Sequence, residues 1–430
     1  MSADTPQHQP ATSGIADDLQ ALTGLAGEEL SRRYSASLLN VFGSPQRVLV
    51  RGQGATVWDA DGRAYLDLLG GIAVNALGHA HPLLTSVVSS QLSTLGHVSN
   101  FFASPTQIAL AERLLTLSNA PAGSHVFFAN SGTEANEAAF KLARRNEGGN
   151  GAPERTRIIA LTHSFHGRTA GALAMTWKQA YREPFEPLPG GVEWIEAGNV
   201  EALEAAVDET VQAVIVEPIQ GEAGVLPLPQ GYLTKVREVT KAAGALMIID
   251  EVQTGIGRPG NWFASQTAAE SGIPHAMTLA KGLGGGGPSG AMIVFGEETS
   301  ALLNPGQHGT TFGGNPVATA AALATLHVIE QENLLAHVTD TGNWLAGELS
   351  GVEGVHGVHG RGLLVGFEVD SGLAPHVVQS GLDEGFIVNA TGPDTVRLAP
   401  PLIVTKEQLS TFVAALPRLL DEARKRQQAA

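Results

Sequence analysis

From about residue 107 to residue 300, short apolar runs alternate with longer segments whose apolar residues recur at helical spacing. The short runs favour buried strands, and the longer segments favour helices that pack one apolar face against a sheet. Because parallel strands are joined by helical crossovers, the pattern predicts an α/β fold with a mostly parallel central sheet covered on both faces. The predicted strands lie in HVFF, RIIAL, AVIVEP, ALMIID, AMTLA and AMIVF, and the clearest helices in EANEAAFKLARR and YLTKVREVTKAAG.

The regions on either side have different patterns. The N-terminal one contains a helical segment and then a hairpin whose turn is predicted at Asp61-Gly62. The C-terminal one mixes helices with strand candidates and contains no internal repeat. Its helices are predicted at 317–338 and 406–425 and its strands within GLLVGFEV and TVRLAPPLIV, and the N-terminal helix is predicted at 17–39.

A chain of 430 residues exceeds the size at which one hydrophobic core usually stops growing, so two domains are expected. The two flanking regions would together form a smaller α+β domain beside the large one. The predicted division is a disordered tail at 1–25, segments of the small domain at 26–75 and 316–430, and a large domain at 76–315.

Composition disfavours several classes of binding partner and excludes cysteine-based sites. With 26 basic against 42 acidic residues the net charge is −16, which disfavours nucleic acid and acidic membrane surfaces as partners. The absence of cysteine rules out disulfides, a thiolate nucleophile and cysteine-based metal sites. The first residues lack the basic and apolar regions of a leader, and no run approaches the roughly 18 apolar residues of a membrane span. The cytoplasm is therefore the expected compartment.

Polar residues follow several of the predicted strands, at the ends where open parallel sheets bind ligands. Ser131, Gly132 and Thr133 follow the first strand and precede a strong helical pattern, an arrangement that points N–H groups and hydroxyls at a phosphate. A capping box, with Ser131 as N-cap and Glu134 three residues later, explains the same residues. Both interpretations can hold together.

Two further strand ends carry charged groups. Asp250 ends ALMIID, where burial of an ionised carboxylate is costly unless it is paired. A protonated aromatic nitrogen is a fitting partner for it, and capping of the next turn is the alternative. Lys281 follows AMTLA and precedes a glycine-rich stretch, whereas the other six lysines lie in polar or helical contexts. Desolvation would lower the pKa of the Lys281 amine and favour an imine with an aldehyde, although a lone strand-end lysine is usually structural.

Phe165 and Arg168 follow another strand, in THSFHGRT. Phe165 could stack on a flat ring while Arg168 binds a carboxylate in fork geometry, and a core phenylalanine beside a surface ion pair is the ordinary alternative. The glycines from Gly282 to Gly287 fit a dinucleotide fingerprint poorly, because a strand pattern follows them instead of a helix. No HExxH sequence or carboxylate cluster accompanies the histidine pairs, so no catalytic metal is predicted.

Taken as an ordered set, these segments resemble the class III (ornithine/acetylornithine type) aminotransferases from about residue 40 to 420. The set comprises SGTEANEAAFKLAR, FHGRT, VEPIQGEAG, IIDEVQTGIGR, TLAKGLGGG and HGTTFGGNP. Within the family the nearest likeness is to the bacterial N-acetylornithine aminotransferases of arginine biosynthesis. The resemblance implies a fold type I transferase that uses pyridoxal 5'-phosphate and works as a homodimer with active sites at the subunit interface.

The same resemblance implies roles for individual residues. Lys281 would hold pyridoxal phosphate as a Schiff base and then move a proton, and Asp250 would pair with the ring nitrogen. Phe165 would stack on the ring, and Gln253 would contact its phenolic oxygen. The phosphate would be bound by Ser131, Gly132 and Thr133, joined by Thr311, or Thr310, of the partner subunit.

Substrate-binding groups follow from the resemblance as well. Arg168 is similar to the residue that receives the carboxylate of acetylornithine, and Arg397 to the one that binds the α-carboxylate of glutamate or 2-oxoglutarate. Glu222 would pair with Arg397 when the smaller dicarboxylate is absent, so that one pocket serves both substrates of a ping-pong enzyme. Relatives often carry Tyr near the position of Phe42, so a hydroxyl contact to the substrate is expected to be missing.

The expected reaction is transfer of the δ-amino group of N2-acetyl-L-ornithine to 2-oxoglutarate, which gives N-acetyl-L-glutamate 5-semialdehyde and L-glutamate. Ornithine, succinylornithine or 4-aminobutyrate as the donor would need the same fold and both arginines. A noncatalytic binding protein with this fold is an alternative from another class. A dehydrogenase is a further one, and it predicts nicotinamide binding and no cofactor absorbance from the protein itself.

Overall fold

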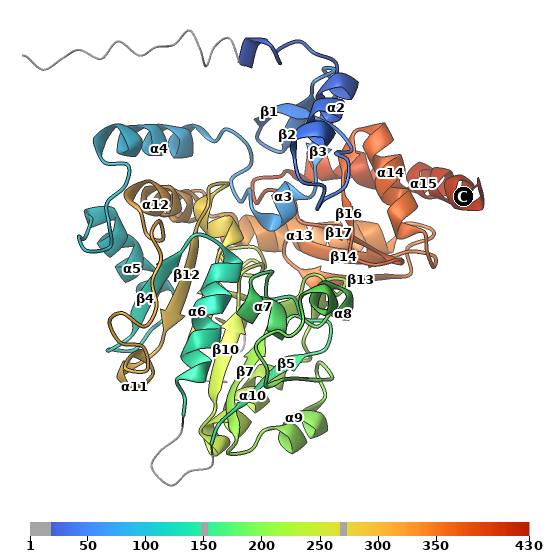
Figure 1. Cartoon of the computed structure of the whole chain (residues 1–430). Helices are drawn as coiled ribbons and strands as arrows, with labels where there is room; N and C mark the ends of the chain where they lie inside the picture. The colour runs from blue at the N-terminus through green and yellow to red at the C-terminus, as the bar shows by residue number, and fades with distance from the viewer. Residues whose placement is uncertain (1–18, 148–153, 267–272, 430) are drawn as a thin grey trace, which may run out of the picture.

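A computed structural model describes residues 19–147, 154–266 and 273–429, so most of the predicted N-terminal tail lies outside the described residues. A seven-stranded sheet in the order β4-β12-β11-β10-β7-β5-β6 forms its centre (Figure 1). All neighbours pair in parallel except β12, which runs antiparallel to β11 and β4. The predicted, mostly parallel sheet is confirmed, and its strands are β4 (His125–Ala129), β5 (Arg157–Leu161), β6 (Val192–Ile195), β7 (Val211–Val216), β10 (Leu246–Asp250), β11 (Ala276–Leu279) and β12 (Gly290–Val294).

Helices cover both faces of this sheet because alternate residues of each strand point to opposite sides. In β10, Ile248 packs into one apolar cluster, and Met247 and Ile249 pack into another. The first cluster is covered by α6 (Gly132–Arg144), the second by α9 (Val200–Ala206) and α10 (Tyr232–Ala243). The strands β7, β10, β11 and β12 are therefore buried on two sides, which explains why they read as nearly continuous apolar runs.

Three more helices enclose the β4 side of the sheet, seen at the left of Figure 1. Leu110 and Leu114 of one helix share a core with Ile293 of β12 and with Leu326 and Ile329 of another. This core continues into the C-terminal part of the chain, so the two parts are joined by packed apolar side chains. The helices are α4 (Pro82–Thr94), α5 (Pro105–Leu117) and α12 (Pro316–Gln331).

The predicted hairpin is present, and Gly62 lies at its turn with φ 85°, a backbone conformation that glycine adopts at little cost. Its second strand pairs in parallel with a short strand from the C-terminal region. The two ends of the chain thus share one sheet, which supports our proposed small domain of 26–75 and 316–430. The strands are β1 (Leu49–Gln53), β2 (Thr56–Asp59), β3 (Ala64–Asp67) and β15 (Phe386–Ile387), preceded by α2 (Gly27–Ser37).

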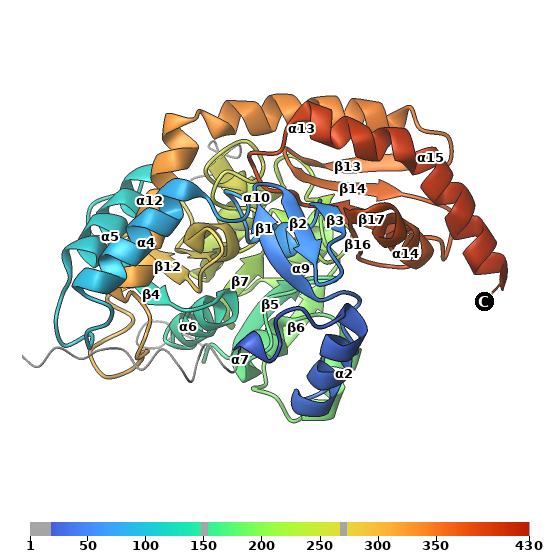
Figure 2. The ribbon, with the colours of Figure 1, turned by 90° about the horizontal axis from the view of Figure 1, so that it is seen from above.

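A second, antiparallel sheet completes the C-terminal region, in the order β13-β14-β17-β16. Figure 2 shows α13 and α15 lying along it. Its strands are β13 (Gly357–Arg361), β14 (Leu364–Glu368), β16 (Asn389–Ala390) and β17 (Thr395–Leu398), and its helices α13 (Leu334–Ser350), α14 (Ala374–Glu384) and α15 (Lys406–Ala429).

Three predicted elements differ in extent. The helix expected at 17–39 is interrupted, because residues 21–24 form a turn in which Gly24 has a φ of 79°, and α2 covers only Gly27–Ser37. The single helix expected at 317–338 is two helices, because Asn333 adopts a left-handed conformation with φ 52° between α12 and α13. The strand expected in TVRLAPPLIV ends at Leu398, because Pro400 and Pro401 have no N–H to donate to a ladder.

The remaining elements are short and lie in the connections. None of the helices in the three described ranges is both long and apolar enough to span a bilayer. The short elements are α3 (Gly70–Ala73), α7 (Ala170–Met175), α8 (Gln179–Arg182), η1 (Glu183–Phe185), β8 (Ile219–Gln220), β9 (Leu226–Pro227), η3 (Lys281–Gly284) and α11 (Glu297–Ser300).

Candidate active site

A cavity of about 420 Å³ opens at the carboxyl ends of the parallel strands. The segments that follow β4, β5, β7, β10 and β11 form its wall, as expected for an open α/β sheet. Most of the residues singled out from the sequence therefore lie around one space. They are Ser131, Gly132, Thr133, Phe165, Arg168, Glu222, Asp250, Gln253 and Lys281.

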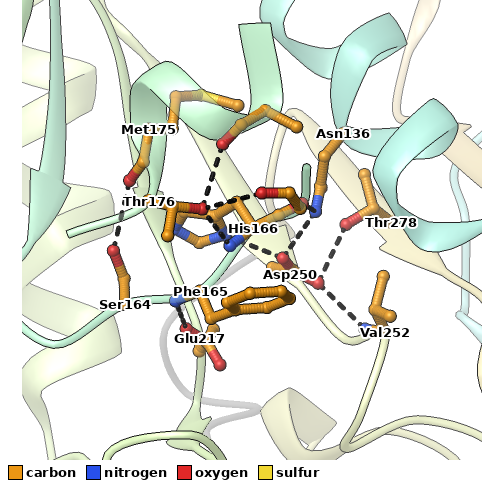
Figure 3. A network of polar contacts seen from close by, with 12 residues as sticks. Asn136, Ser164, Phe165, His166, Met175, Thr176, Glu217, Asp250, Val252 and Thr278 are labelled. Carbon is orange, nitrogen blue, oxygen red and sulfur yellow. Dashed lines mark hydrogen bonds and ion pairs between the residues drawn. The ribbon is translucent and has the colours of Figure 1, made fainter. Parts of the chain in front are cut away.

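The carboxylate of Asp250 is buried, 4% exposed, and is held by four contacts (Figure 3). Its Oδ2 accepts a hydrogen bond from Asn136 Nδ2 at 2.7 Å and lies 2.8 Å from His166 Nδ1. Its Oδ1 accepts from the Val252 N–H at 3.0 Å and from the Thr278 hydroxyl at 3.3 Å. Donors on both oxygens fix the plane of the carboxylate at the cavity wall.

His166 and Asn136 were not predicted from the sequence, although His166 adjoins Phe165 in FHGRT. Burial lowers the pKa of His166, but its hydrogen bond to Asp250 and the charges of Asp250 and Glu217 outweigh burial and raise the pKa overall. The contact with Asp250 thus favours the protonated form of His166 in this buried position. Its Nε2 has no hydrogen-bond partner among the described residues.

Lys281 begins the 3₁₀ turn η3 directly after β11, with the unusual φ of 45°. Burial lowers the pKa of its amine from 10.5 to about 8; Arg397 acts in the same direction, and the acidic groups Glu222, Asp250 and Glu217 oppose it. The shift predicted from the strand-end position is therefore present. A lysine with this pKa has an appreciable fraction of free amine near neutral pH.

A lowered pKa of Lys281 predicts how the cofactor-free protein reacts with an aldehyde. Only the neutral amine attacks a carbonyl, so the second-order rate with pyridoxal phosphate should rise with pH up to about pH 8 and then level off. At pH 7.5 about a quarter of the amine would be free, against about 0.1% for an unperturbed lysine. Stopped-flow absorbance across pH 6 to 10 measures this, and a rate still rising steeply beyond pH 9.5 would contradict it.

The segment after β4 is a capping box, as one interpretation of the sequence held. Ser131 Oγ accepts the Glu134 N–H at 3.3 Å, and Glu134 Oε2 accepts the Asn130 N–H at 2.8 Å. The N–H groups of Gly132 and Thr133 lie in the first turn of α6, where no preceding helical carbonyl can receive them. They face the cavity and form an anion-binding position, so the capping and phosphate interpretations are compatible.

The side chains near the first turn of α6 pack closely against the segments that follow β5 and β10. A Cβ at Gly132 would lie 2.6 Å from Val252 Cγ1, so only glycine leaves the approach open. The hydroxyl of Thr133 accepts the N–H groups of Arg168 and Thr169, both at 3.0 Å. Thr133 thus joins the start of α6 to the FHGRT segment and fixes the backbone of Arg168.

Arg397 on β17 is 1% exposed and lies behind the cavity rather than on its surface. Its Nη1 donates to Glu222 Oε1 at 2.5 Å and to Gln253 Oε1 at 3.2 Å, and its Nη2 donates to Asn389 Oδ1 at 2.8 Å. Burial raises the pKa of Glu222, but the charges of Arg397 and Lys281 outweigh it and lower the pKa overall. The structure therefore contains the Arg397–Glu222 pair that the resemblance implied, with Glu222 between the guanidinium and the cavity.

Thr310, Thr311 and Phe42 do not line this cavity. The Thr310 hydroxyl accepts a hydrogen bond from Asn130 Nδ2 at 3.1 Å, and Asn130 itself lies at the rim. Thr311 is exposed, and Phe42 is 88% exposed. Within one chain the structure thus separates these three residues from the rest of the predicted site.

Glu217, at the end of β7, lines the cavity and was not singled out from the sequence. It is 6% exposed and accepts the N–H of Phe165 at 2.8 Å, which holds that aromatic residue in place. Burial raises the pKa of Glu217 to about 7, with the charge of Asp250 adding to the effect and His166 opposing it. Its position in VEPIQGEAG, directly after a buried strand, was the available signal. Across the described ranges, no three acidic or histidine side chains gather as a metal-binding group.

Comparison with known proteins identifies the family of this chain. The family model described as Aminotransferase class-III matches residues 42–420. The chain belongs to the class III aminotransferases. The match spans every strand of the described structure and includes every residue that lines the cavity.

Individual class III aminotransferases are similar to this chain, in sequence or in structure, over almost its whole length. Acetylornithine aminotransferases of Streptomyces coelicolor and Mycobacterium tuberculosis are 50% and 49% identical to it, covering 93% and 92% of this chain and 97% and 96% of their own. The solved structure of ornithine aminotransferase from Toxoplasma gondii superposes with a TM-score of 0.88 at 29% identity, covering 96% of this chain and 99% of its own. N-acetylornithine aminotransferase from Stenotrophomonas maltophilia superposes with a TM-score of 0.77 at 34% identity, covering 91% and 98%.

Proposed function

We propose that this class III aminotransferase moves the δ-amino group of N2-acetyl-L-ornithine to 2-oxoglutarate, giving N-acetyl-L-glutamate 5-semialdehyde and L-glutamate in arginine biosynthesis. The observation that carries the proposal is the pair of guanidinium groups at the cavity, Arg168 open to it and Arg397 covered by Glu222. A long amine with one carboxylate and a shorter dicarboxylate each need such a cation. Relatives at about half identity that bear the name acetylornithine aminotransferase support the choice of donor.

The cavity fits pyridoxal 5'-phosphate. A buried carboxylate with donors on both oxygens, Asp250, suits a protonated ring nitrogen, and the first turn of α6 suits a phosphate. Phe165 provides a ring face, and Lys281 provides an amine with a lowered pKa. When bound, the cofactor supplies an electron sink for the carbon that loses its proton.

The side chains of this protein then have separate tasks. Lys281 would hold the cofactor through its amine and would move a proton between the substrate carbon and the cofactor carbon to which its amine is joined. Asp250 would keep the ring nitrogen protonated, and His166 and Asn136 orient Asp250. Gln253, whose Oε1 accepts from Arg397, lines the same cavity and would contact the phenolic oxygen.

We further propose a homodimer in which Thr311, or Thr310, of the partner subunit completes the phosphate site. Support comes from Thr311, which is exposed and lies outside the cavity of its own chain. Large apolar side chains are also exposed in the same part of the chain and nearby, at Phe312, Phe101, Phe102 and Leu39. A cytoplasmic location stays a prediction from the sequence.

The proposal is tested by the visible absorbance of the purified protein during anaerobic addition of single amines without a keto acid. The cofactor band should bleach fastest with acetylornithine and return when 2-oxoglutarate is added. Fastest bleaching with free ornithine or 4-aminobutyrate would keep the cofactor assignment and move the enzyme out of arginine synthesis. The absence of a band even after pyridoxal phosphate is supplied would reject the proposal.

Replacing Glu222 with glutamine should strengthen binding of 2-oxoglutarate. Arg397 would no longer have a charged partner to exchange for the incoming carboxylate, so we expect the KM for 2-oxoglutarate to fall about tenfold. The rate with acetylornithine in the first half-reaction should change much less, because its carboxylate is assigned to Arg168. Steady-state kinetics with each substrate varied in turn measure both quantities. Glu201→Gln, an exposed change on α9, is the matched control.

A further inference from the structure

The ring of Tyr181, on α8, lies against the guanidinium of Arg168. Arg168 Cζ is 3.6 Å from the centroid of that ring and 5.6 Å from the centroid of Phe165. The Phe165 and Tyr181 rings stand nearly perpendicular, at 88°, with centroids 6.5 Å apart. Phe165 and Arg168 line the cavity and Tyr181 does not. Tyr181 thus supports two residues of the active site from outside it.

Stacking on Tyr181 is the main restraint on the Arg168 side chain. In the described parts of the chain the guanidinium makes no ion pair and no hydrogen bond, and only the backbone N–H of Arg168 is held, by Thr133. A guanidinium that lies on an aromatic face keeps all of its N–H donors free at its edge. The stacked Arg168 is therefore oriented in advance and can still receive a carboxylate with two parallel hydrogen bonds.

The helix α8 is short, so it restrains Tyr181 only because other contacts hold α8 against the sheet. The neighbouring Arg182 provides this attachment, because its Cζ lies 4.0 Å from the centroid of Trp194 on β6. Arg182 Nη2 also donates to the carbonyl of Trp177 at 3.3 Å, and Trp194 Nε1 donates to the carbonyl of Met175 at 3.3 Å. A chain of contacts therefore leads from the edge of the large sheet through α8 to Arg168.

We propose that Tyr181 is a positioning residue that sets the affinity of the enzyme for the carboxylate of the amine donor by holding Arg168 in its binding orientation. The inference rests on the proposed function in assigning that carboxylate to Arg168. Arg397 does not depend on Tyr181, because it is oriented by Glu222, Gln253 and Asn389. Loss of Tyr181 should therefore weaken carboxylate binding at Arg168 and leave the orientation of Arg397 unchanged.

The test compares Tyr181→Leu with Tyr181→Phe in the holoenzyme, because phenylalanine keeps the ring face and leucine removes it. Tyr181→Leu should raise the KM for acetylornithine about tenfold, with kcat changed less than about twofold. Tyr181→Phe should behave like the unmodified enzyme. N-acetyl-L-norvaline, which has the same carboxylate but no amine to react, should bind about tenfold more weakly to Tyr181→Leu alone, as measured by calorimetry.

If leucine at position 181 disturbs α8, a double-mutant cycle with Arg168→Lys still isolates the effect of the Tyr181 ring on Arg168. Lysine lacks the planar fork, so Tyr181→Leu should cost little further affinity for N-acetyl-L-norvaline in that background. Equal losses in both backgrounds, or an unchanged KM for acetylornithine in Tyr181→Leu, would overturn the inference. If the unmodified holoenzyme responded to some other carboxylate-bearing amine, the proposed donor would be wrong, while the comparison of Tyr181→Leu with Tyr181→Phe on that amine would still decide the role of Tyr181.

Discussion

Replacing Lys281 with alanine is expected to reduce turnover by about four orders of magnitude, the largest effect of any single change in this protein. The substitution removes both the amine that attaches the cofactor and the group that moves the proton. The other nitrogen groups nearby cannot take over, because His166 is hydrogen-bonded to Asp250 and the guanidinium of Arg397 is not a base. Single-turnover absorbance with acetylornithine measures the remaining rate.

The matched control for this change is Lys235→Ala, which alters a lysine paired with Glu204 and Glu238 on the surface. It should leave turnover within about twofold of the unmodified enzyme. Cofactor should still associate with the Lys281→Ala protein, since Asp250, Phe165 and the first turn of α6 are unchanged. Full activity in Lys281→Ala would refute the assignment of the catalytic lysine.

Replacing Asp250 with asparagine is expected to lower kcat about a thousandfold while the protein stays folded. Asparagine has the same shape but no charge, so the ring nitrogen of the cofactor would lose the partner that keeps it protonated. The change also removes the hydrogen bond and the charge of Asp250, which raise the pKa of His166, so that pKa should fall although the charge of Glu217 still opposes the effect of burial.

This second prediction has two measurements. The first is kcat, compared with that of Asp208→Asn, a matched change at an exposed aspartate whose effect should be within about twofold. The second is the His166 imidazole signal in NMR spectra across pH, which should shift from the charged form to the neutral form when Asp250 is replaced. Unaltered kcat together with an unaltered His166 signal would show that Asp250 does not control the ring nitrogen.

The sequence by itself determined six of the seven strands of the central sheet, all but β6, together with the hairpin turn at Asp61-Gly62 and the set of polar residues at the strand ends. These are local properties. Apolar periodicity reports which side of an element is buried, and a turn that needs positive φ selects glycine. The carboxyl ends of parallel strands meet at one edge, so Lys281 and Asp250 could be placed at one site before the structure was known.

Tertiary structure alone decided which partners surround those residues. Asn136 and Asp250 are 114 positions apart, and Arg397 and Glu222 are 175 apart, so neither contact leaves a mark in the local pattern. The stacking of Arg168 on Tyr181 and the raised pKa of buried Glu217 depend on packing and desolvation in the same way. Periodicity encodes burial, whereas the orientation of a charged side chain is set by neighbours that only the folded chain brings together.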